Sequence, residues 1–172
     1  MPDAISNTSP LLYLHRINGM SWLPRLFTGI YVPGAVVFEL MEGRQKGYDV
    51  PNPSDYGWIR IVEPRVMPSE WFAVDLGIGE IAAMSLALER PDHIVLLDDA
   101  LARKMATAAG LNVWGTLRIL LEAKSQKRLG SGLALPLYFL SPFNHLAYRG
   151  IMNAEMIFAR WEDSSPPIWR PW

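Results

Sequence analysis

The chain of 172 residues contains no cysteine. This absence excludes a disulfide framework, thiolate chemistry and any metal site built on thiolates. Its three histidines, His15, His93 and His145, are too far apart along the chain to form a paired histidine motif. A metal site in this protein would therefore use oxygen ligands, which suit a hard ion such as Mg²⁺ or Mn²⁺.

Several common catalytic signatures are also missing. The chain has no P-loop, no glycine-rich dinucleotide fingerprint and no G-x-S-x-G element. The segment "GIGE", residues 77–80, is not a dinucleotide fingerprint, because it lacks a third glycine and has no strand directly before it. The sequence therefore gives no support to nucleotide-cofactor chemistry of these kinds or to a serine hydrolase.

Charge of one sign and long hydrophobic runs are scarce as well. Sixteen basic and seventeen acidic residues give a net charge of −1, so the molecule as a whole does not attract nucleic acid. The densest apolar run, residues 133–140, contains a proline and is far shorter than the ~20 residues that span a bilayer. The first residues lack the pattern of a signal peptide. We expect a cytoplasmic protein with no membrane partner.

A nucleic-acid partner would need a local basic patch. Residues between 103 and 128 can supply one, namely Arg103, Lys104, Arg118, Lys124, Lys127 and Arg128. A solvated helix face explains the same residues, and the sequence favours that interpretation.

Half of the residues are apolar, which indicates one globular domain. Apolar runs typical of strands alternate with segments of helical periodicity. Strands are expected at 4–6, 29–33, 58–64, 93–97 and 111–115, and helices at 10–18, 33–43, 77–89, 101–110 and from 116 onward. This alternation predicts an α/β fold with three layers, in which helices flank a central, mostly parallel sheet. We expect a domain core over 1–130, a helical extension of it over 131–162 and a flexible tail over 163–172.

Residue types also predict how the helices begin and which faces they bury. Ser9 is expected as an N-cap with Pro10 at the first helical position, and Thr116 is expected to cap a later helix. The apolar faces are expected to include Val36, Val37, Leu40 and Met41, then Ile81, Met84 and Leu88, and finally Leu117, Leu120 and Leu121.

Polar residues follow three of the expected strands. Asn7 follows the first strand, Asp98 and Asp99 follow the fourth, and Thr116 follows the last. In an open α/β sheet, ligands bind beyond the carboxyl ends of the strands. Two helix acids, Glu39 and Glu80, join these candidates. Two like charges 4 Å apart repel by about 4 kcal/mol at an effective dielectric of 20, and a divalent cation would relieve that repulsion.

Each candidate also has a purely structural explanation. Glu39 can be an exposed helix acid, and Glu80 can complement the helix dipole. One of the two aspartates can cap the helix that begins at Ala100, and Asn7 can stabilise a turn. The residues alone leave these alternatives open.

Four segments, taken in order and spacing, resemble a known family. They are "SNTSPLLYL", "VPGAVVFEL", "DLGIGEIAAMSLALE" and "VLLDDALARKMATAAGLNVWGTLRILLEAK". The chain is similar, over residues 4–129, to the PIN-like domains, in a poorly characterised prokaryotic branch related to VapC-type toxin ribonucleases. The resemblance implies a PIN fold and a metal-dependent ribonuclease site.

Matched motif by motif, the resemblance implies a catalytic and metal-binding set of Asn7, Glu39, Glu80 and Asp99, with Asp98 flanking the last acid. Active relatives usually carry aspartate where this chain has Asn7, and asparagine offers a carbonyl oxygen without charge. Consecutive residues of an extended chain point to opposite sides, so both aspartates are not expected to contact the same ion. Thr8, Ser9 and Thr116 are candidate hydroxyls that support the ligands or contact phosphate.

The resemblance implies an Mg²⁺- or Mn²⁺-dependent endoribonuclease that hydrolyses phosphodiester bonds in single-stranded RNA. Two alternatives accompany it. The first is a catalytically impaired PIN-like module that binds RNA or a protein. The second is the toxin of a toxin–antitoxin pair, which a small antitoxin protein would inhibit. The family also implies a homodimer.

Overall fold

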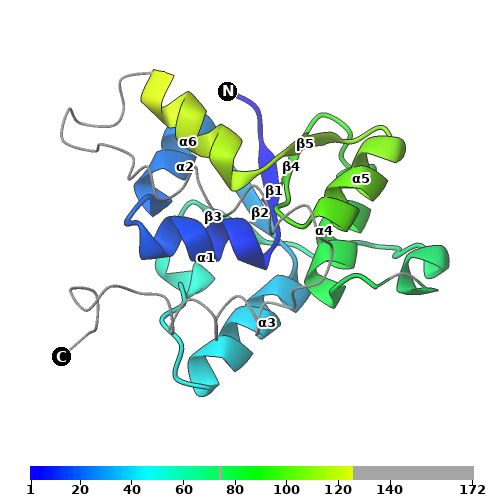
Figure 1. The fold of residues 1–172 in the computed structure, drawn as a ribbon, viewed down its shortest axis with the longest axis horizontal. Coiled ribbons are helices and arrows are strands. Elements are labelled where there is room, and N and C mark those ends of the chain that lie inside the picture. The colour runs from blue at the N-terminus through cyan, green and yellow to red at the C-terminus, as the bar shows by residue number, and fades with distance from the viewer. Residues whose placement is uncertain (74, 126–172) are drawn as a thin grey trace.

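A computed structural model describes residues 1–73 and 75–125 of the chain. Within them, five parallel strands form one sheet in the order β3-β2-β1-β4-β5 (Figure 1). The strands are β1 (Ala4–Ser6), β2 (Ile30–Val32), β3 (Ile59–Ile61), β4 (Ile94–Leu96) and β5 (Asn112–Trp114). The predicted parallel sheet is therefore confirmed, with β1 at its centre between β2 and β4.

Helices cover both faces of the sheet. They are α1 (Thr8–Arg16), α2 (Leu23–Leu26), α3 (Gly34–Gln45), α4 (Ile78–Leu88), α5 (Ala100–Ala108) and α6 (Thr116–Ser125). Short 3-10 turns, η1 (Met20–Trp22), η2 (Pro53–Asp55) and η3 (Ser69–Ala73), connect some of them. Helices α1, α2 and α6 pack on one face, whereas α4 and α5 pack on the other (Figure 1). The expected three-layer α/β architecture is thus present.

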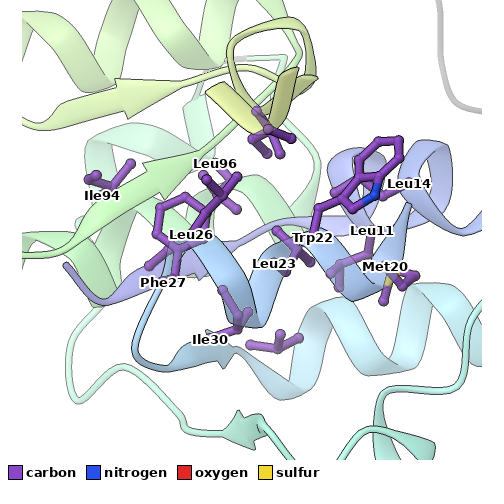
Figure 2. Close-up of a cluster of buried hydrophobic side chains, with 14 of the residues drawn as sticks. Leu11, Leu14, Met20, Trp22, Leu23, Leu26, Phe27, Ile30, Ile94 and Leu96 are labelled. Carbon is purple, nitrogen blue, oxygen red and sulfur yellow. The ribbon is translucent and has the colours of Figure 1, made fainter. Parts of the chain in front are cut away.

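Alternating strand residues build two separate cores. Ile94 and Leu96 of β4 point to the face of α1, α2 and α6, where Trp22 and Phe27 fill the space between the helices and the sheet (Figure 2). Val95 lies in the second core, against α4 and α5. Because side chains of a strand alternate between faces, a strand that is covered on both sides is apolar throughout, as β4 is.

Two predicted helix starts are wrong. Helix α1 begins at Thr8 with Asn7 in the N-cap position, so Ser9 is not the N-cap and Pro10 is the third helical residue, not the first. Thr116 is the first residue of α6, and its hydroxyl binds Asp98 rather than the start of its own helix. In both cases the first helical residue is a threonine whose hydroxyl binds an acid on another element, Glu39 for Thr8 and Asp98 for Thr116, and helix propensity does not register such contacts.

Some residues of the expected apolar faces are exposed. Leu117 and Leu121 are 50% and 55% exposed, because α6 buries the residues in phase with Thr116, namely Ile119, Leu120 and Ala123. Met41 of α3 and Leu88 of α4 are also exposed, since each lies at the margin of a face narrower than the sequence suggests.

The parallel arrangement brings the ends of the strands to one edge of the sheet. Asn7 directly follows β1, Asp98 and Asp99 lie just past β4, and Gly115 directly follows β5. Among the described residues, no helix is long and apolar enough to cross a membrane. The predicted extension over 131–162 and tail over 163–172 lie outside the described residues.

Candidate functional site

The side-chain oxygen of Asn7, Oδ1, is buried and accepts no hydrogen bond from the described residues. Its side chain is 2% exposed, and its backbone N–H donates to the carbonyl oxygen of Leu96, 3.3 Å away. The side chain does not cap α1, and its Oδ1 atom has no hydrogen-bond partner among the described residues. Leaving such a group unsatisfied costs roughly 1–3 kcal/mol, so this oxygen is a place where a ligand would be stabilising.

Glu39 reaches this edge from α3 and holds two neighbouring elements together. Its Oε2 accepts a hydrogen bond from the hydroxyl of Thr8, the residue after Asn7. Its Oε1 accepts from the backbone N–H of Gly79, 2.9 Å away, in the first turn of α4. A Cβ atom on Gly79 would lie 2.5 Å from Oε2 of Glu39, so only glycine permits this approach. Glu39 is therefore not the freely exposed helix acid of the structural alternative.

Glu80 lies in the first turn of α4, where its Oε2 accepts from the N–H of Gly77 at 2.8 Å. Burial raises the pKa of its carboxyl from 4.5 to about 7. The charges of Asp99, Glu39 and Asp75 raise this pKa further, whereas the Gly77 hydrogen bond lowers it. The carboxylates therefore stand close enough to repel one another, and the described residues do not neutralise them.

Asp99 and Asp98 face different partners, as expected for consecutive residues after a strand. Asp99 is the N-cap of α5, and its Oδ1 accepts from the N–H of Ala102 at 2.7 Å. Both oxygens of Asp98 bind Thr116, from its N–H at 2.8 Å and from its hydroxyl at 2.6 Å. The prediction that one aspartate caps the helix from Ala100 is thus confirmed. The cap uses only Oδ1 of Asp99, so it leaves Oδ2 available.

The groups that surround Asp98 were not predicted from the sequence. Burial raises its pKa, whereas the hydrogen bonds from Thr116 and the charge of Arg103 lower it. Burial and the Asp98 charge raise the pKa of Tyr13 to about 12, while Arg16 lowers it. Tyr13 therefore stays a neutral phenol beside the carboxylate at physiological pH. No local pattern indicated this pairing, because the two residues come from α1 and the end of β4.

The structure thus brings the candidates together in two groups. The charges of Asp99 and Glu39 act on Glu80, and Thr8 connects Glu39 to the neighbourhood of Asn7. Asp98 belongs with Thr116 and Arg103. In the part of the chain that the structure describes, no side-chain hydrogen bond joins Ser9 to these acids.

The donor set suits a hard divalent ion in its chemistry. All candidate donors are carboxylate or amide oxygens, and the Oδ1 of Asn7, which has no partner among the described residues, could serve as a neutral ligand. Within residues 1–73 and 75–125, however, no three acids or histidines stand close enough to form a ready-made metal cluster. Glu39, Glu80 and Asp99 are each held by a backbone N–H, and Gly77 and Gly79, which the sequence analysis did not select, supply two of these contacts.

A comparison with family models matches residues 3–136 of the chain to a model described as a PIN domain. The match covers more than half of the chain and includes every strand and helix described above. No curated protein matches the chain.

Proposed function

The chain belongs to the PIN domain family, and from this premise we propose that it is a metal-dependent endoribonuclease that cleaves single-stranded RNA. The family supports a nuclease-type function, and the substrate and the metal dependence are our proposal. The observation that carries the proposal is the buried Oδ1 of Asn7, which has no hydrogen-bond partner among the described residues, together with the charges of Glu39 and Asp99 that act on Glu80.

In this proposal Asn7, Glu39, Glu80 and Asp99 hold Mg²⁺ or Mn²⁺. The ion, when bound, would stabilise negative charge on the phosphate and promote attack by water at phosphorus. The carboxylates offer their charge and the asparagine its carbonyl oxygen, which are the donors that these ions prefer.

The protein's own groups prepare this site in two ways. The N–H groups of Gly77 and Gly79 hold the carboxylates of Glu80 and Glu39 in fixed positions, so little ordering is needed when a ligand arrives. The raised pKa of Glu80 means that a proton competes with a cation for its carboxyl near neutral pH. A cation would displace this proton, so binding should release protons near neutral pH.

Cleavage of a fluorescent single-stranded RNA tests the proposal. The native protein should cleave with Mg²⁺ or Mn²⁺ and not with EDTA, and Glu80→Gln should abolish cleavage. Glu42→Gln is the matched control, because Glu42 is an exposed acid of α3 that takes no part in these contacts. Full metal-dependent cleavage by Glu80→Gln would refute the assignment.

A second candidate function is a PIN module that binds RNA or a protein without cleaving. Two observations favour it: Asn7 has no charge, and the described acids do not form a ready-made cluster. It predicts that the native protein does not cleave RNA and that Asn7→Asp creates metal-dependent cleavage.

The toxin role, an antitoxin partner and a homodimer stay predictions from the family resemblance. An antitoxin would co-purify as a small protein when the chain is isolated from its native operon. Growth unaffected by overexpression would contradict the toxin role. Sedimentation of the isolated chain would test the homodimer.

A further inference from the structure

We propose that Arg103 and Arg118 form a pair that binds phosphates of the RNA strand beside the acidic site. This inference rests on the proposed function, and it assigns a substrate-binding role to two basic residues. The sequence alone favoured a solvated helix face for both.

Arg118 is held by an aromatic ring. Its guanidinium carbon lies 4.3 Å from the ring centroid of Trp114, the last residue of β5. The edge of Phe27 packs against the same indole, with ring centroids 5.5 Å apart. Because these two contacts occupy the indole, Trp114 serves as a support for the arginine rather than as a surface on which a base could stack.

The side chain of Arg103, on α5, lies beside Gly115, the residue that follows Trp114. Its Nη1 lies 3.3 Å from the position that a Cβ would take on Gly115, and Oδ1 of Asp98 lies 3.2 Å from the same position. The glycine thus leaves room for the guanidinium beside the carboxylate. Any side chain at 115 would press on both groups.

The guanidinium N–H donors of both arginines make no hydrogen bond within the described part of the chain. Both oxygens of Asp98 already accept from Thr116, and within residues 1–73 and 75–125 no hydrogen bond or ion pair engages either guanidinium. A guanidinium presents five N–H donors in a planar fork that matches a phosphate. Two such groups are thus placed by packing and retain their full donor capacity.

Their position fits a substrate strand. Helix α5, which carries Arg103, packs on one face of the sheet and α6, which carries Arg118, on the other (Figure 1), and the two side chains lie beside Gly115 and Trp114 at the end of β5. Asp98 and Asp99 follow the adjacent strand β4. The acids of the site repel a phosphodiester, and two cations beside them offset that repulsion. A strand that enters the site would therefore be held where it passes β5.

Binding of a fluorescent single-stranded RNA in EDTA tests the inference without any need for cleavage. Arg103→Gln and Arg118→Gln should each weaken binding roughly tenfold, as expected for a lost hydrogen bond to a charged group. Each should also reduce the slope of log Kd against log salt concentration by about 0.7. Lys104→Gln and Lys124→Gln remove the same charge from exposed positions of the same helices and should change the affinity much less.

Arg103→Lys and Arg118→Lys retain the charge, and they identify effects that arise from a disturbed fold. The inference would be overturned if Arg103→Gln and Arg118→Gln left the affinity and the salt slope unchanged. It would also be overturned if Lys104→Gln and Lys124→Gln weakened binding as much as the two arginine variants do. Equal competition by a polyglutamate peptide and by RNA would also overturn it, since the pair would then recognise carboxylates. If RNA binds through the arginines but is never cleaved, the nuclease proposal fails and this inference stands.

Discussion

Thr116 holds the carboxylate of Asp98 through two hydrogen bonds, from its N–H to Oδ1 at 2.8 Å and from its hydroxyl to Oδ2 at 2.6 Å. This contact joins the end of β4 to the start of α6. It fixes which face of α6 packs on the sheet, because Ile119, Leu120 and Ala123 follow Thr116 at helical spacing and are all buried. The carboxyl edge of the sheet is therefore held by side chains as well as by the strand ladder.

Thr116→Val removes the hydroxyl donor and leaves its acceptor on Asp98 without a partner. We expect the free energy of unfolding to fall by about 2 kcal/mol at pH 7, because a buried carboxyl oxygen loses its donor. Thr116→Ser keeps the hydroxyl and should retain most of the stability. Urea denaturation of the three proteins measures the difference, and equal stabilities for valine and serine would show that the hydroxyl contributes nothing.

Gly79→Ala places a methyl group 2.5 Å from Oε2 of Glu39. In an open helix position this change would stabilise by about 1 kcal/mol, because alanine favours the helix. Here we expect a loss of about 1–3 kcal/mol instead, since α4 must move away from α3. Gly57→Ala is the control, because a Cβ there meets no atom within 4 Å. Thermal unfolding measures both, and a stabilised Gly79→Ala protein would contradict the close approach.

Asn7→Asp introduces a charge at a position that is 2% exposed. Without a divalent ion we expect the melting temperature to fall by several degrees, because the new charge is buried and no cation there compensates it. Mn²⁺ should then stabilise this variant more than it stabilises the native protein. The exposed Asn112→Asp serves as the control. If Mn²⁺ did not change the melting temperature of Asn7→Asp, Oδ1 of Asn7 would not face a metal site.

The pKa of Glu80, raised from 4.5 to about 7, makes a signed prediction about stability. Between these values the folded state binds more protons than the unfolded state, so this group's contribution to stability falls as the pH rises from 4.5 to 7. The loss at pH 8 is at most about 3 kcal/mol, at 1.4 kcal/mol for each pKa unit. Glu80→Gln should remove this dependence. Urea denaturation in EDTA at pH 5 and pH 8 measures it, and identical pH profiles of variant and native protein would contradict the shift.

The sequence predicted the sheet because the strand residues are apolar on both faces, as in "IVLL" of β4. It also identified the polar residues that follow the strands. The partners of those residues could not be predicted, because each contact joins distant segments. Thr8 binds Glu39, which lies thirty-one positions away in the sequence, and Gly79 binds the same carboxylate from forty positions away. Helix periodicity also could not show that Thr116 faces inward, since its partner lies on another element.

A calorimetric titration of Mn²⁺ into the native protein, Glu80→Gln and Glu42→Gln tests the central claim most directly. We predict that the native protein and Glu42→Gln bind the ion with release of protons near pH 7, and that Glu80→Gln does not bind it. Equal binding by the native protein and Glu80→Gln, or no binding by the native protein, would contradict a metal site built on Asn7, Glu39, Glu80 and Asp99.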